Sequence, residues 1–216
     1  MGKLDLEVIL NVLIWKGKNI MKKKILITML TVSLLMPVMT GCGADNRNSD
    51  EVQKETVKDV SEMVHMENAA AVKELMDAAY AKVAQDMLPA ALDTNEMDTA
   101  DMDAVTYNTG LNDLTGIDNI ILSESMMNAV AYSAVYLITN DEADASATRD
   151  KLMDSVDPAK WICTSAEKQA AVLIGKDVFF VMGRSDTVDA VMSAVIEEAK
   201  SRNFSVSETV ERVNEI

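Results

Sequence analysis

The feature that most constrains this chain is an apolar stretch at residues 25–36, which begins directly after three lysines and ends before Pro37. A positively charged start followed by a short apolar stretch is typical of a secretory signal peptide. The stretch is shorter than the roughly 20 residues that a membrane-spanning helix needs. We therefore expect it to be removed, and we expect the domain to form from the residues after it, outside the cytoplasm.

A cysteine motif follows, made of Met39, Thr40, Gly41 and Cys42. It resembles the lipobox of bacterial lipoproteins, although Met39 stands where that motif usually has leucine. The resemblance implies that Cys42 receives a diacylglyceryl thioether and becomes the mature N-terminus, at the outer face of the cytoplasmic membrane. Several acyl chains hold a protein there, because each buried methylene contributes about 0.8 kcal/mol. The alternative is an ordinary signal peptide in which Gly-Cys occurs by chance.

Residues 1–20 fit a signal peptide poorly, because Met21 stands directly before the lysines. Residues 16–19 are encoded by purine-rich codons, as a ribosome-binding site would be. We therefore expect residues 1–41 to be an upstream segment plus the lipoprotein signal peptide, with Met21 as the true start.

The charge of the remaining chain excludes one class of partner. The segment before Cys42 carries six of the 20 basic residues and two of the 35 acidic ones, so 14 basic and 33 acidic residues follow it. A chain this acidic is repelled by nucleic-acid phosphates and anionic lipid head groups. We expect no nucleic-acid partner, and solubility is the simplest explanation of the charge.

The pattern of apolar residues predicts a polar, lipidated tether at residues 42–66 and a single globular domain at 67–216. We expect helices at residues 68–88, about 99–107, from Asn140 or Asp141 to about 156, from the capping Ser185 to about 200, and from Ser207. We expect strands at residues 119–122, 129–138, 170–174 and 178–182, the last two joined as a hairpin through Gly175. This order predicts an α+β fold, a small antiparallel sheet with helices packed on it.

The layout resembles the bacterial lipoprotein family defined by domain of unknown function 4358, found mainly in Gram-positive gut bacteria. The residues that carry the resemblance are Thr-Gly-Ile-Asp at 115–118, a strand ending Ala-Val-Tyr-Leu-Ile at 134–138, Trp161 after a helix, and the hairpin around Gly175. The resemblance covers residues 67–202. It implies an extracytoplasmic α+β domain and brings no catalytic residues.

One motif suggests catalysis. Ser165 and Lys168 match the Ser-x-x-Lys pattern of penicillin-binding enzymes, in which lysine activates the serine. However, no Lys-Thr-Gly follows, the domain is too short for that fold, and Ser165 precedes a strand instead of opening a helix. The only histidine, His65, lies in the predicted tether, which leaves a Ser-His-Asp site without support.

Metal ligands are equally sparse. Met63, His65 and Met66 offer soft ligands for copper, but methionine is also an ordinary gap-filler in a core poor in aromatic residues. The acidic residues 93–103 lack the spacing of an EF-hand loop, which favours a solvated acidic loop. Cys163 follows Trp161 and Ile162, so we expect a buried thiol. No cofactor is expected.

These observations favour a non-enzymatic binding or interaction module of the cell envelope, anchored through Cys42. An envelope serine enzyme using Ser165 and Lys168, and a metal- or small-molecule-binding lipoprotein, are the alternatives.

Overall fold

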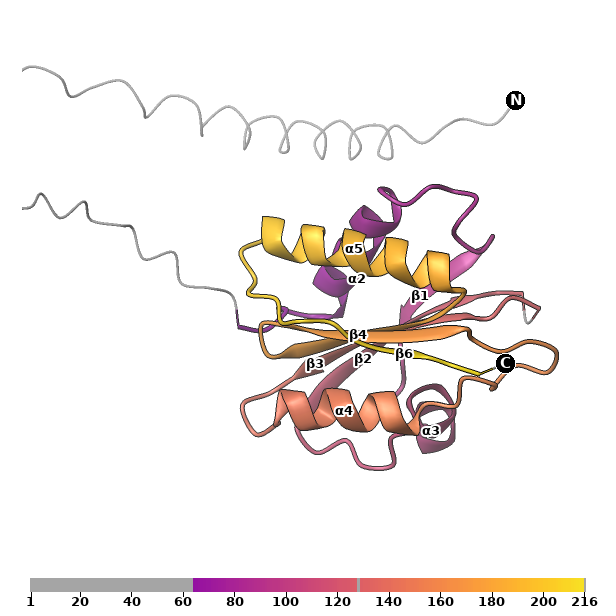
Figure 1. Ribbon diagram of the computed structural model, residues 1–216. Helices are drawn as coiled ribbons and strands as arrows, with labels where there is room; N and C mark the ends of the chain where they lie inside the picture. The colour runs from indigo at the N-terminus through magenta and orange to yellow at the C-terminus, as the bar shows by residue number, and fades with distance from the viewer. Residues whose placement is uncertain (1–63, 128, 216) are drawn as a thin grey trace, which may run out of the picture. The chain divides into compact units, whose positions relative to one another are not determined.

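Six strands form one antiparallel sheet in the computed structural model, which describes residues 64–127 and 129–215 (Figure 1). In chain order the strands are β1 (Leu92–Glu96), β2 (Ile117–Ser125), β3 (Tyr132–Thr139), β4 (Lys168–Ile174), β5 (Asp177–Gly183) and β6 (Val210–Val213). Their order across the sheet is β1-β2-β3-β5-β4-β6. The predicted α+β class with an antiparallel sheet is confirmed.

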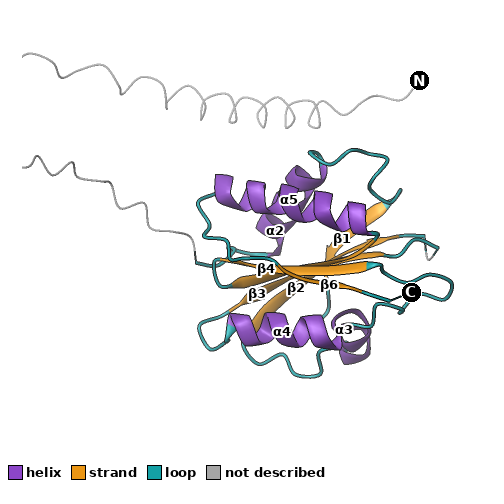
Figure 2. Cartoon of the chain, viewed as in Figure 1, coloured by secondary structure: helices purple, strands orange, loops and turns teal. Residues whose placement is uncertain are grey.

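Helices cover both faces of this sheet (Figure 2). α2 (Ala69–Tyr80) and α5 (Ser185–Ser201) lie on one face, and α3 (Met102–Thr109) and α4 (Ala145–Ser155) lie on the other. Because both faces are covered, the central strands β3 and β5 are buried along their whole length. Successive side chains of a strand point to opposite faces, so neighbouring residues supply two separate cores.

The hairpin between β4 and β5 forms where the sequence predicts it. Gly175 has a φ of 61°, a conformation that a residue without Cβ adopts at little cost. Ile174 pairs with Asp177 across this two-residue connection. The turn therefore fixes the register of two fully paired strands.

Two strands lie where the sequence predicts none. β1 consists of Leu-Asp-Thr-Asn-Glu, which is poor in strand-forming residues, and β6 replaces the helix predicted from Ser207. Both are edge strands, which are paired on one side only and are largely exposed. Strand formation at an edge depends on the neighbouring strand, here β2 or β4, more than on local propensity.

Several predicted boundaries are wrong. α2 ends at Tyr80 instead of residue 88. Single hydrogen-bonded turns follow it, and the later apolar residues in these turns pack against the same core. The cap of α4 is Asp144, whose side chain accepts a hydrogen bond from the Ala147 amide, and neither Asn140 nor Asp141 takes that role. Strand 119–122 extends over all of β2, and strand 129–138 begins only at residue 132.

The start of α5 is also capped differently from the prediction. Ser185 is the first helical residue, and its amide donates to Glu167 Oε2 at 2.9 Å. A carboxylate from the segment before β4 therefore satisfies a free amide at this N-terminus, as a capping side chain would.

The domain begins before the predicted boundary at residue 67. The Lys176 amide donates to the Val64 carbonyl at 2.8 Å, and Met66 is 5% exposed within the core beneath α2 and α5. Residues 64–66 therefore belong to the domain. The rest of the predicted tether, the signal peptide and the lipobox residues Met39, Thr40, Gly41 and Cys42 lie outside the described residues. Within the described residues, no helix is long and apolar enough to cross a membrane.

Candidate functional site

An open cavity of about 480 Å³ lies between β1, the end of β2 and the start of α3. This volume falls within the roughly 300–1,000 Å³ that is usual for small-molecule sites. Among the described residues that line the cavity, five are acidic and none is basic. The acidic residues are Asp93, Glu96, Asp98, Asp101 and Glu124.

Strand alternation and a helix start place Asp93, Asp98 and Asp101 on the α3 side of the sheet, whereas Glu96 alternates with Asn95 and lies on the side of Thr94, beside α2. On β1, Thr94 is buried toward Ser123, so Asp93 and Asn95 point to the opposite side. Asp101 then caps α3 by accepting a hydrogen bond from the Ala104 amide at 3.1 Å. Acidic side chains are favoured at a helix N-terminus because of its partial positive charge. The acidic loop predicted from the sequence is therefore one wall of a cavity.

The carboxylates in this wall are held by neutral donors. Asn95 donates to Asp93 Oδ2 at 2.7 Å, and Asn119 donates to Glu96 Oε1 at 2.6 Å. Across residues 64–127 and 129–215, no ion pair involves Asp93, Glu96, Asp98 or Asp101. The cavity therefore keeps a negative potential that favours a cation.

The fifth carboxylate is different, because a buried lysine holds it. Lys160 Nζ pairs with Glu124 Oε1 and donates to Asn108 Oδ1 at 2.7 Å and to Ser133 Oγ at 3.2 Å. Its side chain is only 2% exposed. Glu124 and Asn108 both line the cavity, whereas Lys160 does not. Lys160 therefore holds two polar groups of the cavity in place from outside its lining.

Two aromatic rings complete the surroundings of this ammonium. Lys160 Nζ lies 5.3 Å from the ring centroid of Tyr107 and 5.4 Å from that of Trp161, within the range of cation–π attraction. Burial lowers the pKa of Lys160, and the nearby Glu124 carboxylate partly opposes that effect. A buried ionisable group of this kind next to a cavity is a recognised marker of a functional site. The residues around it lie far apart in the sequence, which is why sequence reasoning missed Lys160.

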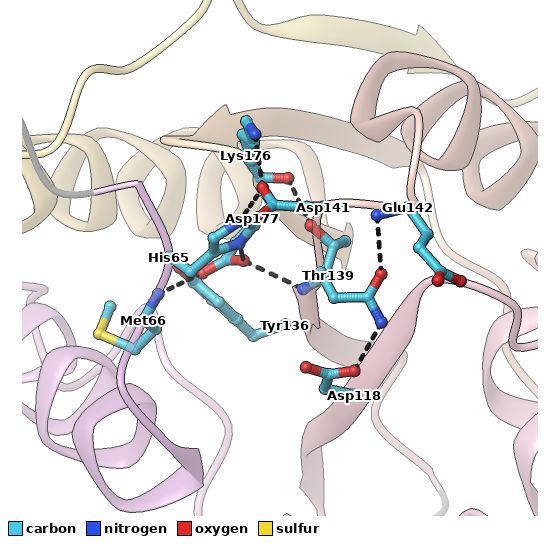
Figure 3. A network of polar contacts seen from close by, with 10 residues as sticks. His65, Met66, Asp118, Tyr136, Thr139, Asp141, Glu142, Lys176 and Asp177 are labelled. Carbon is cyan, nitrogen blue, oxygen red and sulfur yellow. Dashed lines mark hydrogen bonds and ion pairs between the residues drawn. The ribbon is translucent and has the colours of Figure 1, made fainter.

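A second polar cluster is centred on the buried Asp177, at the start of β5 (Figure 3). Its carboxylate accepts four hydrogen bonds: from His65 Nδ1 at 2.9 Å, the Met66 amide at 2.6 Å, the Thr139 amide at 3.0 Å and the Tyr136 hydroxyl at 3.2 Å. Burial raises the pKa of Asp177, although the hydrogen bonds from Met66, His65 and Thr139 oppose that effect. All four partners are donors, so this carboxylate ties residues 65 and 66 to the sheet.

An aspartate beside a histidine also occurs in catalytic sites, but this pair is not arranged for catalysis. His65 Nε2 is a buried atom with no hydrogen-bond partner in the described part of the chain, and Asp141 Oδ1 lies 3.8 Å away. Because the atom that would accept a proton is covered, a substrate has no access to it. The geometry instead makes His65 a structural contact, as Figure 3 shows.

The residues of the predicted serine site are placed unfavourably for catalysis. Lys168 Nζ pairs with Asp189 at 2.6 Å and with Glu211 at 2.8 Å. These hydrogen bonds raise the pKa of Lys168, whereas a lysine that activates serine must lose its proton readily. Within the described residues, no hydrogen bond joins Ser165 to Lys168.

The predicted metal ligands do not converge. The described residues contain no group of three or more histidine, cysteine or acidic side chains arranged to hold a metal. His65 and Met66 contribute to the Asp177 cluster, and Met63 lies outside the described residues. Cys163 is exposed, contrary to the prediction of a buried thiol, because it lies in the surface connection before β4 next to the 92% exposed Ile162.

Comparisons with known proteins add no relative. No protein-family model matches the chain, and neither the curated proteins nor the solved structures contain a match. The resemblance to the lipoprotein family therefore stays a prediction from the sequence.

Proposed function

We propose that this chain is a membrane-anchored extracytoplasmic lipoprotein whose acidic cavity binds a cationic group of an envelope component. The observation that carries the proposal is that Asp93, Asp98 and Asp101 line one cavity and that no cation among the described residues pairs with them. Carboxylates that stabilise a fold usually form ion pairs within the protein. These carboxylates form none with the described residues, although they line the same cavity. A cationic ligand gains from all three, because the field of like charges adds up in a cleft.

The address of the protein is part of this proposal. The lysines, the short apolar stretch and the motif ending at Cys42 favour lipid attachment outside the cytoplasm. In cells, the Cys42→Ser variant is expected to move from the membrane fraction to the soluble fraction. A variant that stays in the membrane fraction would contradict lipid anchoring while leaving the cavity untouched.

The chain enters the domain far from the cavity, which agrees with a binding role. Residues 64–66 are attached beside Thr139, at one end of β3, whereas Glu124 and Ser133 pair near the other end. These ends are about 20 Å apart at about 3.3 Å per strand residue. Residues 64–66 therefore do not cover the cavity.

Binding of a lysine decapeptide to the full-length protein in nonionic micelles tests the cavity. The variant that combines Asp98→Asn with Asp101→Asn is the sharpest probe, because asparagine keeps the capping oxygen and removes only the charge. We expect its affinity to fall about tenfold or more, equivalent to about 1.4 kcal/mol. Isothermal titration at low salt measures the effect, since exposed charges are screened at high salt.

The matched control combines Asp118→Asn with Glu142→Gln, which also removes two negative charges, here beside the Asp177 cluster (Figure 3). We expect it to bind the decapeptide nearly as well as the native chain. Equal loss in both variants would show that only net charge matters, and the cavity would then have no specific role.

A further inference from the structure

Exposed apolar side chains occur in the chain segments that form the acidic cavity. Of the eight large hydrophobic residues that are exposed in the described part of the chain, Met126 lines the cavity, and three others belong to the same two segments, the end of β2 and α3. These four, which we call the apolar rim, are Met102, Tyr107, Met126 and Met127, with exposed fractions of 37%, 55%, 69% and 46%. A group of this kind on a soluble domain marks an interaction site more often than a single exposed residue does.

The residues of the apolar rim are linked to the lining residues by adjacency in the sequence or by contact with Lys160. Met126 is one of the lining residues, and Met127 follows it. Met102 follows the lining residue Asp101, and the Tyr107 ring contacts Lys160, which in turn holds two lining side chains. The segments that form the cavity therefore carry unpaired carboxylates together with exposed methionines and an aromatic ring.

We infer that this surface docks a segment of a partner protein that carries both basic and apolar side chains. The inference rests on the proposed function and names the class of its ligand. Carboxylates in the cavity receive lysine or arginine, and the apolar rim receives the intervening apolar residues. Methionine suits this role because its flexible, polarizable side chain adapts to different partners.

Other occupants fit this surface less well. A second copy of the chain would bring its own negative charge, since the formal net charge is −15. Anionic lipid head groups are repelled for the same reason. A small polyamine would pair with the carboxylates and leave the apolar rim exposed to water.

Three probes separate these ligand classes on the full-length protein in nonionic micelles, with empty micelles as the blank. They are spermidine, a lysine decapeptide and a decapeptide of alternating lysine and leucine. At about 0.15 M salt, where surface charges are screened, we expect the alternating peptide to bind about tenfold more tightly than the lysine decapeptide, although it carries half the charge.

A matched pair of variants tests the apolar rim directly. Met102→Ser combined with Met127→Ser should remove the advantage of the alternating peptide and leave lysine decapeptide binding unchanged. Val213→Ser, which removes a 75% exposed apolar side chain on β6, should leave both affinities unchanged.

The possible failures are distinguishable. Binding of spermidine or of the lysine decapeptide as tight as that of the alternating peptide would overturn the protein-segment inference and leave the proposal of a cation-binding cavity intact. If none of the three probes binds, the proposed function itself fails and the inference fails with it.

Discussion

The two polar clusters of this domain lie near opposite ends of the sheet and treat their carboxylates in opposite ways. Around Asp177, protein donors satisfy one buried carboxylate with four hydrogen bonds. Around the cavity, the exposed carboxylates of Asp93, Asp98 and Asp101 each accept a hydrogen bond from a neutral amide group, and no cation among the described residues pairs with them. The carboxylate of the first cluster has all its partners within the protein, whereas the carboxylates of the second can still pair with a cation.

The difference separates a structural site from a binding site. A buried carboxylate must be fully hydrogen-bonded, because an unsatisfied charge inside a protein is costly. Exposed carboxylates carry no such requirement, since water solvates them. Substitutions in the first cluster should therefore change stability, and substitutions in the second should change binding.

The largest expected effect is that of Asp177→Asn on stability. Asparagine offers one acceptor oxygen, and its amide group would face backbone donors such as the Met66 or Thr139 amide. We expect a loss of about 3 kcal/mol in the free energy of unfolding, the range found when a buried charged network is broken. Urea denaturation measures it. Asp141→Asn, an exposed neighbour of His65, is the control and should have little effect.

Lys160→Met is expected to affect both quantities, because Lys160 lies behind the cavity. The variant removes three polar contacts of a buried ammonium, so we expect a loss of about 2 kcal/mol in stability. It also leaves Glu124 unpaired, which adds one negative charge to the cavity, so affinity for the lysine decapeptide should rise. A fall in both stability and affinity would show that Lys160 maintains the shape of the cavity and that its charge is secondary.

A smaller effect on stability is expected for His65→Ala. The variant removes one of the four donors to Asp177 and leaves the three others in place. We expect a loss of about 1 kcal/mol, the usual contribution of one hydrogen bond, with no change in decapeptide affinity. Thermal unfolding and titration measure the two quantities. A changed affinity would mean that the two clusters are coupled across the sheet.

The smallest effect concerns the pH dependence of stability. Burial holds the pKa of Lys160 below its ordinary value of 10.5 in the folded state. Between the folded and unfolded pKa values, the unfolded state binds more protons, so the free energy of unfolding rises with pH. As the pH rises toward 10.5, the native chain should therefore gain stability relative to Lys160→Met, as measured by urea denaturation at each pH. A declining difference would contradict the lowered pKa.

The sequence predicted the central strands of the sheet but not its two edge strands. The strands β3, β4 and β5 have continuous apolar residues, which a strand covered on both faces requires. The edge strands β1 and β6 have no such pattern, because their side chains are largely exposed and their pairing comes from β2 and β4. Likewise, the acidic residues 93–103 were visible in the sequence, but their arrangement around a cavity depends on strand register.

The sequence by itself determined the α+β class, the central hairpin at Gly175 and the strongly acidic character of the chain, because apolar periodicity, turn chemistry and charge are local properties. Only the tertiary structure decided what the single charged residues do. Lys160 meets Glu124 and Asn108, and Asp177 meets His65, across separations of 36, 52 and 112 residues. Such contacts depend on how strands and helices pack, and no local pattern encodes them.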